Sequence, residues 1–355
     1  MKQKMKWFIK SWLILFALHT QAHQDPTALL IERKKSYSFT YSLKSSDKIS
    51  VENQFGDIRI VFWEKPQVAV SIQISASSAS DALAQRFLAQ TTVSATKQEG
   101  GAYFKTILKK SSIPVHSYQN KGESNKVRID YVVQMPKNNE LNIVNSFGDI
   151  HLPDYPTKLS LQHSYGNLYT NRLKNNENQV QLSFGKAVIE ALEGGQFKAS
   201  YSSVWLDEAR NLSLQNSFGD LHIKLAENIK GNISYSTGLI EKIKEAAHLQ
   251  LSYSHKFGIG EIDRNTKEID IQSSFSEIEL PKTQEKGAYE FFIQGKHARF
   301  KYEGSQPIIF QKNTEKEPNT TPSSSFRMYR GKIGNVHAPE TRIIIQSNYG
   351  NIRIR

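Results

Sequence analysis

The segment Asn216-Ser-Phe218-Gly-Asp-Leu221-His-Ile223 decides the fold, because near-copies of it recur along the chain. Each copy has an aromatic residue at its centre, numbered here as position 0, followed by Gly or Ser in all ten copies. From Phe147 to Phe275, successive aromatics are 18, 19, 17, 17, 17, 18 and 22 residues apart, which is the spacing of a repeat architecture. The ten aromatics are Phe55, Phe147, Tyr165, Phe184, Tyr201, Phe218, Tyr235, Tyr253, Phe275 and Tyr349.

Apolar residues accompany each aromatic at fixed positions. Position −4 is apolar in nine copies and position +3 in eight, and position +5 is usually apolar as well. Because strand side chains alternate between faces, −4 and 0 share one face while +3 and +5 are out of step with them. All four point inward only if the chain bends between 0 and +3, at the small residue. We therefore expect the aromatics to form a ladder in the core; an aromatic platform that binds sugars is the alternative.

The repeat predicts an all-β fold, a β-solenoid or β-helix-like stack of about 17–19 residues per rung. Units of this length cannot bury an apolar face alone, whereas rungs stacked about 4.8 Å apart share one continuous core. One short helix near the N-terminus, over about 77–90, is predicted from its apolar stripe Ala82, Leu83, Phe87 and Leu88.

The domain organisation follows from the leader, the repeat and a polar tract. The chain opens with lysines, continues with an apolar run and reaches the small-residue site Thr20-Gln-Ala22, which is typical of a signal peptide; an N-terminal membrane anchor is the alternative. The predicted parts are a signal peptide (1–22), an N-terminal β region with the capping helix (23–140), solenoid repeats (141–310), a disordered loop (311–325) and closing strands (326–355).

Composition limits the chemistry that is available. The chain has 355 residues and no cysteine, which excludes disulfides, thiolate catalysis and Cys-ligated zinc. The net charge is +12, of which four charges are leader lysines, so the rest carries about +8. We expect partners among glycans, lipopolysaccharide or envelope proteins, and neither nucleic acid nor, after signal cleavage, a transmembrane segment.

Two histidines and three aspartates are candidate metal ligands. His151 and His222 occupy the same repeat position, but four rungs separate them, or about 19 Å, too far for one zinc ion. Asp57, Asp149 and Asp220 follow the corner glycine, where we interpret them as stabilising the turn rather than binding calcium.

Catalytic motifs are missing from the sequence. It contains no nucleophile elbow, P-loop or His-Glu-x-x-His motif, and nothing distinguishes the paired acids Glu277 and Glu279 from a solvated strand face. We therefore predict no enzyme, no catalytic, cofactor-binding or metal-binding residues and no cofactor, and the binding residues stay open.

The units Asn145-Ser-Phe147-Gly-Asp-Ile150-His-Leu152 and Asn348-Tyr-Gly-Asn-Ile352-Arg-Ile354 resemble the putative adhesin family of exported bacterial proteins, related to autotransporter-adhesin head-like domains. The resemblance includes the leader and the strand–helix–strand around 77–90, and implies a β-solenoid in the envelope or at the cell surface. It implies no catalytic residues. Four copies depart from the pattern with Ser at +1, namely those of Tyr201, Tyr235, Tyr253 and Phe275, so their corner geometry stays open.

These observations predict a non-catalytic, exported, adhesin-like protein that presents a repetitive β surface for binding or scaffolding. The alternatives are a carbohydrate-active β-helix enzyme, and a periplasmic sensor or structural partner of an envelope stress system. We expect the protein in the periplasm, at the outer-membrane surface or outside the cell. The ligand, the oligomeric state and the handedness of the solenoid stay open.

Overall fold

A computed structural model of the protein describes residues 30–109, 125–282, 288–304, 308–310, 326–334 and 340–355. The predicted signal peptide (1–22) and the predicted disordered loop (311–325) lie outside these residues. No helix among them is long and apolar enough to cross a membrane.

The described chain is all-β with one helix, as predicted. The N-terminal elements are β1 (Ile31–Ser42), β2 (Lys48–Gln54), β3 (Ile58–Phe62), β4 (Gln67–Ser78), α1 (Asp81–Gln90), β5 (Thr91–Gln98), β6 (Gly101–Leu108) and β7 (Asn125–Met135). Next come β8 (Leu141–Ser146), β9 (Ile150–Leu152), β10 (Leu159–Ser164), β11 (Leu168–Leu173), β12 (Gln179–Ser183), β13 (Lys186–Leu192), β14 (Gly195–Ser200), β15 (Ser203–Ala209) and β16 (Leu212–Ser217). The last are β17 (Asp220–Ser234), β18 (Thr237–Ser252), β19 (Lys256–Ile262), β20 (Glu268–Leu280), β21 (Tyr289–Tyr302), β22 (Ile308–Phe310), β23 (Phe326–Ile333) and β24 (Thr341–Ile354).

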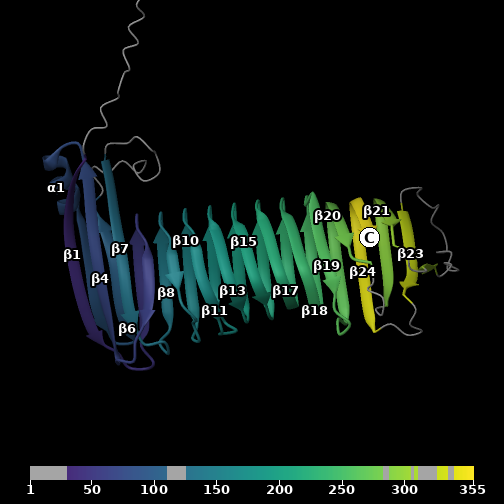
Figure 1. Ribbon diagram of the computed structural model, residues 1–355, viewed down its shortest axis with the longest axis horizontal. Coiled ribbons are helices and arrows are strands. Elements are labelled where there is room, and N and C mark those ends of the chain that lie inside the picture. The colour runs from purple at the N-terminus through teal and green to yellow at the C-terminus, as the bar shows by residue number, and fades with distance from the viewer. Residues whose placement is uncertain (1–29, 110–124, 283–287, 305–307, 311–325, 335–339) are drawn as a thin grey trace, which may run out of the picture.

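Successive repeats pair side by side along the long axis of the molecule (Figure 1). The first strands of the repeats, β8, β10, β12, β14 and β16, are parallel and in register, so that equivalent residues align. Position −4, for example, aligns Ile143, Leu161, Val180, Phe197 and Leu214. The second strands β9, β11, β13 and β15 pair with one another in the same way. All described strands join one sheet, which is nearly closed and barrel-like.

The core is aliphatic. Positions −4, +3 and +5 point inward as predicted, for example Leu214, Leu221 and Ile223, all buried. Position −2 is inward as well, which the parity argument did not include, and Asn216 is fully buried there. Like residues stack over like, so every inward position forms a continuous row from rung to rung.

The prediction that the aromatic ladder fills this core is wrong. The eight aromatics from Tyr165 to Tyr349 are 41–53% exposed, and only Phe55, at the N-terminal end, is buried. The parity count assumed extended backbone through position 0 and placed the bend after it. The bend lies at position 0 itself, where all ten aromatics have φ between 50° and 62°. A left-handed residue between extended ones breaks the alternation of faces, so its side chain points outward.

The ends of the molecule depart from the parallel pattern (Figure 1). At the N-terminal end, β4 pairs antiparallel with both β1 and β7, and α1 lies against β1 and β4. The helix begins at Asp81, later than predicted, because residues 77–78 continue β4. It buries Ala84 and Phe87, whereas the predicted stripe residues Ala82 and Leu83 are exposed.

The C-terminal end contains an inserted strand. β24 lies between β20 and β21 and is parallel to both, although β21 precedes it in the chain. β23 then pairs antiparallel with the free side of β21. The predicted domain boundaries at 140, 310 and 326 remain predictions.

Candidate functional site

The row of aromatic side chains at position 0, together with His297, is called the aromatic ladder below. Its rings stack in rung order, with centroids 4.8–5.1 Å apart and ring planes within 1–11° of parallel from Phe55 to Tyr349. His297 continues the stack, 4.7 Å from Tyr349. The centroid distance matches the spacing of neighbouring strands, so the strand pairing itself sets the stacking. Each inner ring therefore presents its edge to solvent and its two faces to its neighbours.

The ladder stands on strained backbone. The left-handed conformation costs a residue that has a Cβ about 1–2 kcal/mol, and Gly, Asn and Asp adopt it more readily. Stacked aromatic pairs contribute about 0.5–1.5 kcal/mol each, an amount similar to the strain. The aromatic residue therefore brings little net stability to the corner. An exposed ring that recurs there on the eight rungs from Tyr165 to Tyr349 is a candidate for binding.

The aspartates of the Gly-Asp corners accept hydrogen bonds from the next rung. The Asp57 Oδ1 accepts a hydrogen bond from the Asp149 N–H at 2.8 Å, and the Asp149 Oδ1 accepts one from the Asn167 N–H at 2.8 Å. Asp220 accepts a hydrogen bond from the hydroxyl of Thr237 on the next rung. No group of three or more His, Cys, Asp or Glu side chains in the described part of the chain could hold a metal ion.

Corners with Ser at +1 use the hydroxyl group for the same task. The Ser202 Oγ donates to the Ser200 carbonyl at 2.7 Å and accepts from the Gly185 N–H at 3.2 Å. Ser236 makes the equivalent bonds to Ser234 and Gly219. Both kinds of corner keep the aromatic in the left-handed conformation, so the ladder continues through the change from Gly to Ser.

Buried polar residues at position −2 support the corner from inside. The Asn53 and Asn145 side-chain amides donate to the Gly56 carbonyl at 3.3 and 3.1 Å. Asn216 donates to Ser236 on the next rung at 3.1 Å. His163 occupies the same row, 2% exposed, with its Nδ1 3.2 Å from the Asn145 carbonyl. Burial lowers the pKa of His163, against the opposing influence of that carbonyl and of the Asp149 and Asp57 charges.

His151 and His222, the two histidines considered as metal ligands, lie on the outer face of the second strands. His151 stacks on Tyr169 at 5.1 Å, and His222 meets Trp205 edge-on at 4.6 Å. The His222 Nε2 is also 2.5 Å from the Glu241 Oε1. In the strand register His151 is paired with the exposed Tyr169, and His222 with the exposed Trp205. Each histidine therefore has an aromatic neighbour.

The paired acids Glu277 and Glu279 do not face each other in a cleft. Glu277 accepts a hydrogen bond from the Asn351 side-chain amide at 2.9 Å, and Glu279 accepts one from Arg355 at 2.7 Å. Both partners belong to the neighbouring strand β24 or to the residue that follows it. These acids therefore contribute to the pairing of β20 with β24.

Three features of the site were not predicted from the sequence. The outward direction of the ladder was missed because the parity count placed the bend one residue too late. The alternation of Asp or Asn at +2 with Ser at +1 was visible, but its use in accepting N–H groups from neighbouring rungs was not. The buried row at −2 had a signal, since Asn recurs there at Asn53, Asn145 and Asn216.

Comparison with known proteins leaves the family open. No family model matches this chain, and no curated protein matches its sequence. A putative cell adhesion protein from Clostridium sporogenes is 9% identical with a TM-score of 0.20, over 91% of this chain and 99% of its own. A putative adhesin from Bacteroides fragilis is 12% identical with a TM-score of 0.27, over 90% and 97%. A putative lipid binding protein from Parabacteroides distasonis is 14% identical with a TM-score of 0.35, over 90% and 96%. Likenesses at these scores carry no functional argument.

Proposed function

We propose that this chain is a non-catalytic, exported, adhesin-like β-solenoid of the bacterial cell envelope or surface, and that the aromatic ladder is its contact surface. The observation that carries the proposal is the unbroken stack of outward rings from Tyr165 to Tyr349, each about half exposed. Burying such a row against a partner would remove much apolar surface from water.

The strand pairing supports the solenoid part of the proposal. Aligned residues of neighbouring rungs are separated by the repeat length, as in the pairing of Val180 with Phe197 and of Phe197 with Leu214. Both series of strands, before and after the corner, follow this rule. A chain that advances one rung per repeat in both series is winding around one axis.

The shape of the ladder favours an extended partner. Ten steps between neighbouring rings make it roughly 48 Å long at the usual strand spacing. The ring faces are covered by neighbouring rings, so only the edges are available along the row. A ridge of ring edges suits a long apolar or polymeric surface better than a small ligand, which would need a concave pocket.

Export is supported by the leader. Lysines, an apolar run and a small-residue site precede the first described strand. The lack of cysteine requires the core alone to stabilise the chain, and the continuous aliphatic rows provide such a core.

The proposal is tested by replacing Tyr201, Phe218 and Tyr235 together by Asn, which accepts left-handed backbone. Purified, labelled protein is added to intact cells and envelope fractions of the source bacterium. We expect the triple variant to stay folded and to lose at least tenfold in retained protein. The control variant carries Tyr201→Phe and Tyr235→Phe, which keep the rings, and should bind like the parent.

Surface-protease shaving of intact cells, together with cell fractionation, determines independently where the protein is located. Equal retention of parent and triple variant would refute the ladder as a contact surface. Recovery of the native protein only from the cytoplasmic fraction would refute export.

A further inference from the structure

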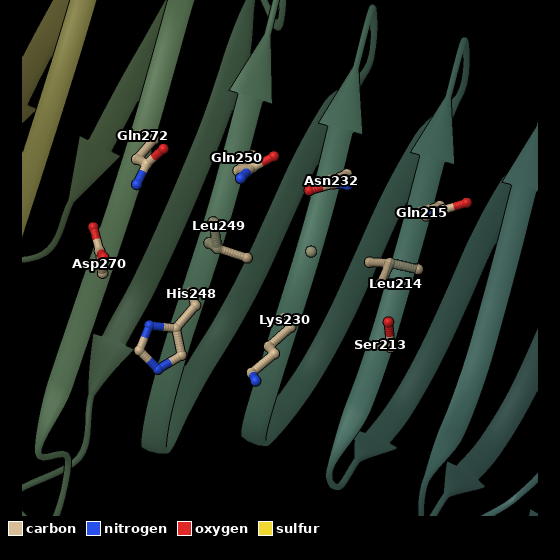
Figure 2. A pocket seen from close by; sticks show the side chains of 11 residues that line it. Ser213, Leu214, Gln215, Lys230, Asn232, His248, Leu249, Gln250, Asp270 and Gln272 are labelled. Carbon is tan, nitrogen blue, oxygen red and sulfur yellow. The ribbon is translucent and has the colours of Figure 1, made fainter.

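A hollow of about 220 Å³ lies on the outer face of the first strands, across β16, β17, β18 and β20 (Figure 2). It is a trough between two rows of outward side chains that run across the strands. Leu214, Gly231 and Leu249 lie between the rows. Both leucines are only 2% exposed, so their side chains point into the core and the floor of the trough is backbone.

The first row consists of carboxamides. Gln215, Asn232, Gln250 and Gln272 align in register, one on each strand, as Figure 2 shows. Four neighbouring strands span about 14 Å at the usual strand spacing. The row therefore offers an amide group at every step along the trough.

The second row lies on the other side of the trough. Lys230, His248 and Asp270 align there on β17, β18 and β20. Lys230 carries a positive charge and Asp270 a negative one, so the two permanently charged side chains of the row balance each other.

The side chains of both rows have no polar partner in the part of the chain that the structure describes. Among the described residues, neither row makes a side-chain hydrogen bond or an ion pair. Charged residues elsewhere on the strands are commonly paired, as Arg172 is with Glu190 at 2.8 Å and Lys242 with Glu261 at 2.7 Å. The hollow therefore gathers polar groups that are available to a ligand.

The chemistry of the rows indicates the ligand. An amide side chain donates through its nitrogen and accepts through its oxygen, which complements a hydroxyl group that does both. A row of amides at regular spacing complements a row of hydroxyl groups at regular spacing. Balanced charge gives an anionic ligand no advantage over a neutral one.

We propose that the trough binds a segment of an extended, uncharged glycan, with the amides of Gln250 and Gln272 at the centre of recognition. This inference goes beyond the proposed function, because none of the residues that line the trough belongs to the aromatic ladder. It requires only hydrogen bonding, and no group in the trough is assigned to catalysis.

The test uses the intact mature protein and defined linear oligosaccharides of glucose and of N-acetylglucosamine in isothermal titration. We expect at least one of these neutral probes to bind, and the double variant Gln250→Ala, Gln272→Ala to weaken its affinity at least tenfold. The matched control is Gln162→Ala, Gln181→Ala, which removes two exposed amides of the same register row on β10 and β12, outside the hollow. It should bind like the parent, and thermal unfolding of all three proteins checks their folding.

Three results would overturn the inference. They are no binding of any neutral probe by the parent, equal loss of affinity in both double variants, or binding only of an anionic oligosaccharide such as polygalacturonate that salt abolishes. Cell binding and the ladder variants are measured separately. If the titration shows no glycan binding while the protein still binds cells, this inference is refuted and the proposed function stands.

Discussion

Each ring of the ladder begins at one left-handed residue, and this residue decides which side of the chain the ring faces. The pattern Ser-Phe-Gly-Asp predicts a bend, and Gly is the usual residue for left-handed backbone, so the bend was placed after the aromatic. The glycine of this motif is instead needed for space, and the aromatic takes the unusual φ. No rule of residue preference would place Phe or Tyr there, since bulky residues rarely adopt it.

Phe218 and Phe197 make a matched pair of tests for this assignment. Phe218 is 45% exposed at position 0, and Phe197 is 1% exposed at position −4 of the neighbouring unit. We expect Phe218→Asn to lower the free energy of unfolding by no more than about 2 kcal/mol, because lost stacking is offset by relieved strain. Phe197→Ala should cost about 3–5 kcal/mol, because it leaves a core cavity.

Chemical denaturation of both variants measures the difference. If the Phe218→Asn protein fails to fold, the ring of Phe218 is part of the core, and the outward, left-handed assignment is wrong.

His163 should make stability depend on pH. Its pKa is lowered by burial, and its Nε2 is buried with no hydrogen-bond partner among the described residues. The folded state therefore binds a proton less readily than the unfolded chain, whose histidine has a pKa near about 6.5. Stability from this residue is complete above that pH and falls as the pH drops through it towards the lowered folded value.

The variant His163→Asn, which repeats the residue found at Asn145 and Asn216, should flatten this part of the pH profile. Denaturation midpoints between pH 7.5 and 5 would show it. Parallel profiles for the parent and His163→Asn would contradict the prediction.

At the scale of the element, the corner is a contact between rungs. A Cβ built on Gly185 would lie 1.9 Å from the Gly166 carbonyl oxygen, and one on Gly166 equally close to the Gly148 carbonyl oxygen. The small residue at +1 was predicted correctly, but as a bend residue. Its physical reason is the close approach of the neighbouring strand, which no single repeat reveals.

The changes in unfolding free energy caused by Gly185→Ala and by Gly258→Ala should therefore differ in sign. At Gly185 the backbone of the preceding rung must move, so we expect a loss of about 1–3 kcal/mol or more. At Gly258 the nearest atom to a new Cβ is the Leu239 Cδ1 at 3.4 Å, an ordinary contact, and Ala should be neutral or stabilise by up to about 1 kcal/mol. Thermal unfolding compares the two, and equal losses would show that the corner glycine is chosen for flexibility alone.

At the scale of the whole molecule, the sequence predicted the all-β class, the order of the repeats and the inward positions −4, +3 and +5. Leu214, Leu221 and Ile223 could be assigned because apolar residues recur at fixed distances from Phe218. The placement of β24 could not be predicted. Its residues Ser347-Asn-Tyr349 match any other rung equally well, and only the three-dimensional pairing shows that it lies between β20 and β21.

Removal of residues 341–355 tests how far neighbouring rungs depend on one another. In a stacked repeat each unit interacts mainly with its neighbours. Hydrogen exchange should therefore become fast in β20 and β21, which lose their shared partner, while β10 to β16 keep their protection. Mass spectrometry of the shortened chain measures this, and loss of protection along the entire stack would instead indicate one all-or-none unit.

The position of β24 also affects when the protein can fold. Because Thr341–Ile354 fills a place between two strands made earlier, the stack stays open at that point until the ribosome has delivered these residues. An incomplete chain exposes the edges of β20 and β21, so the finished form is reached only after synthesis has passed residue 354. The residues made last therefore set the earliest moment at which β20 and β21 can both be paired.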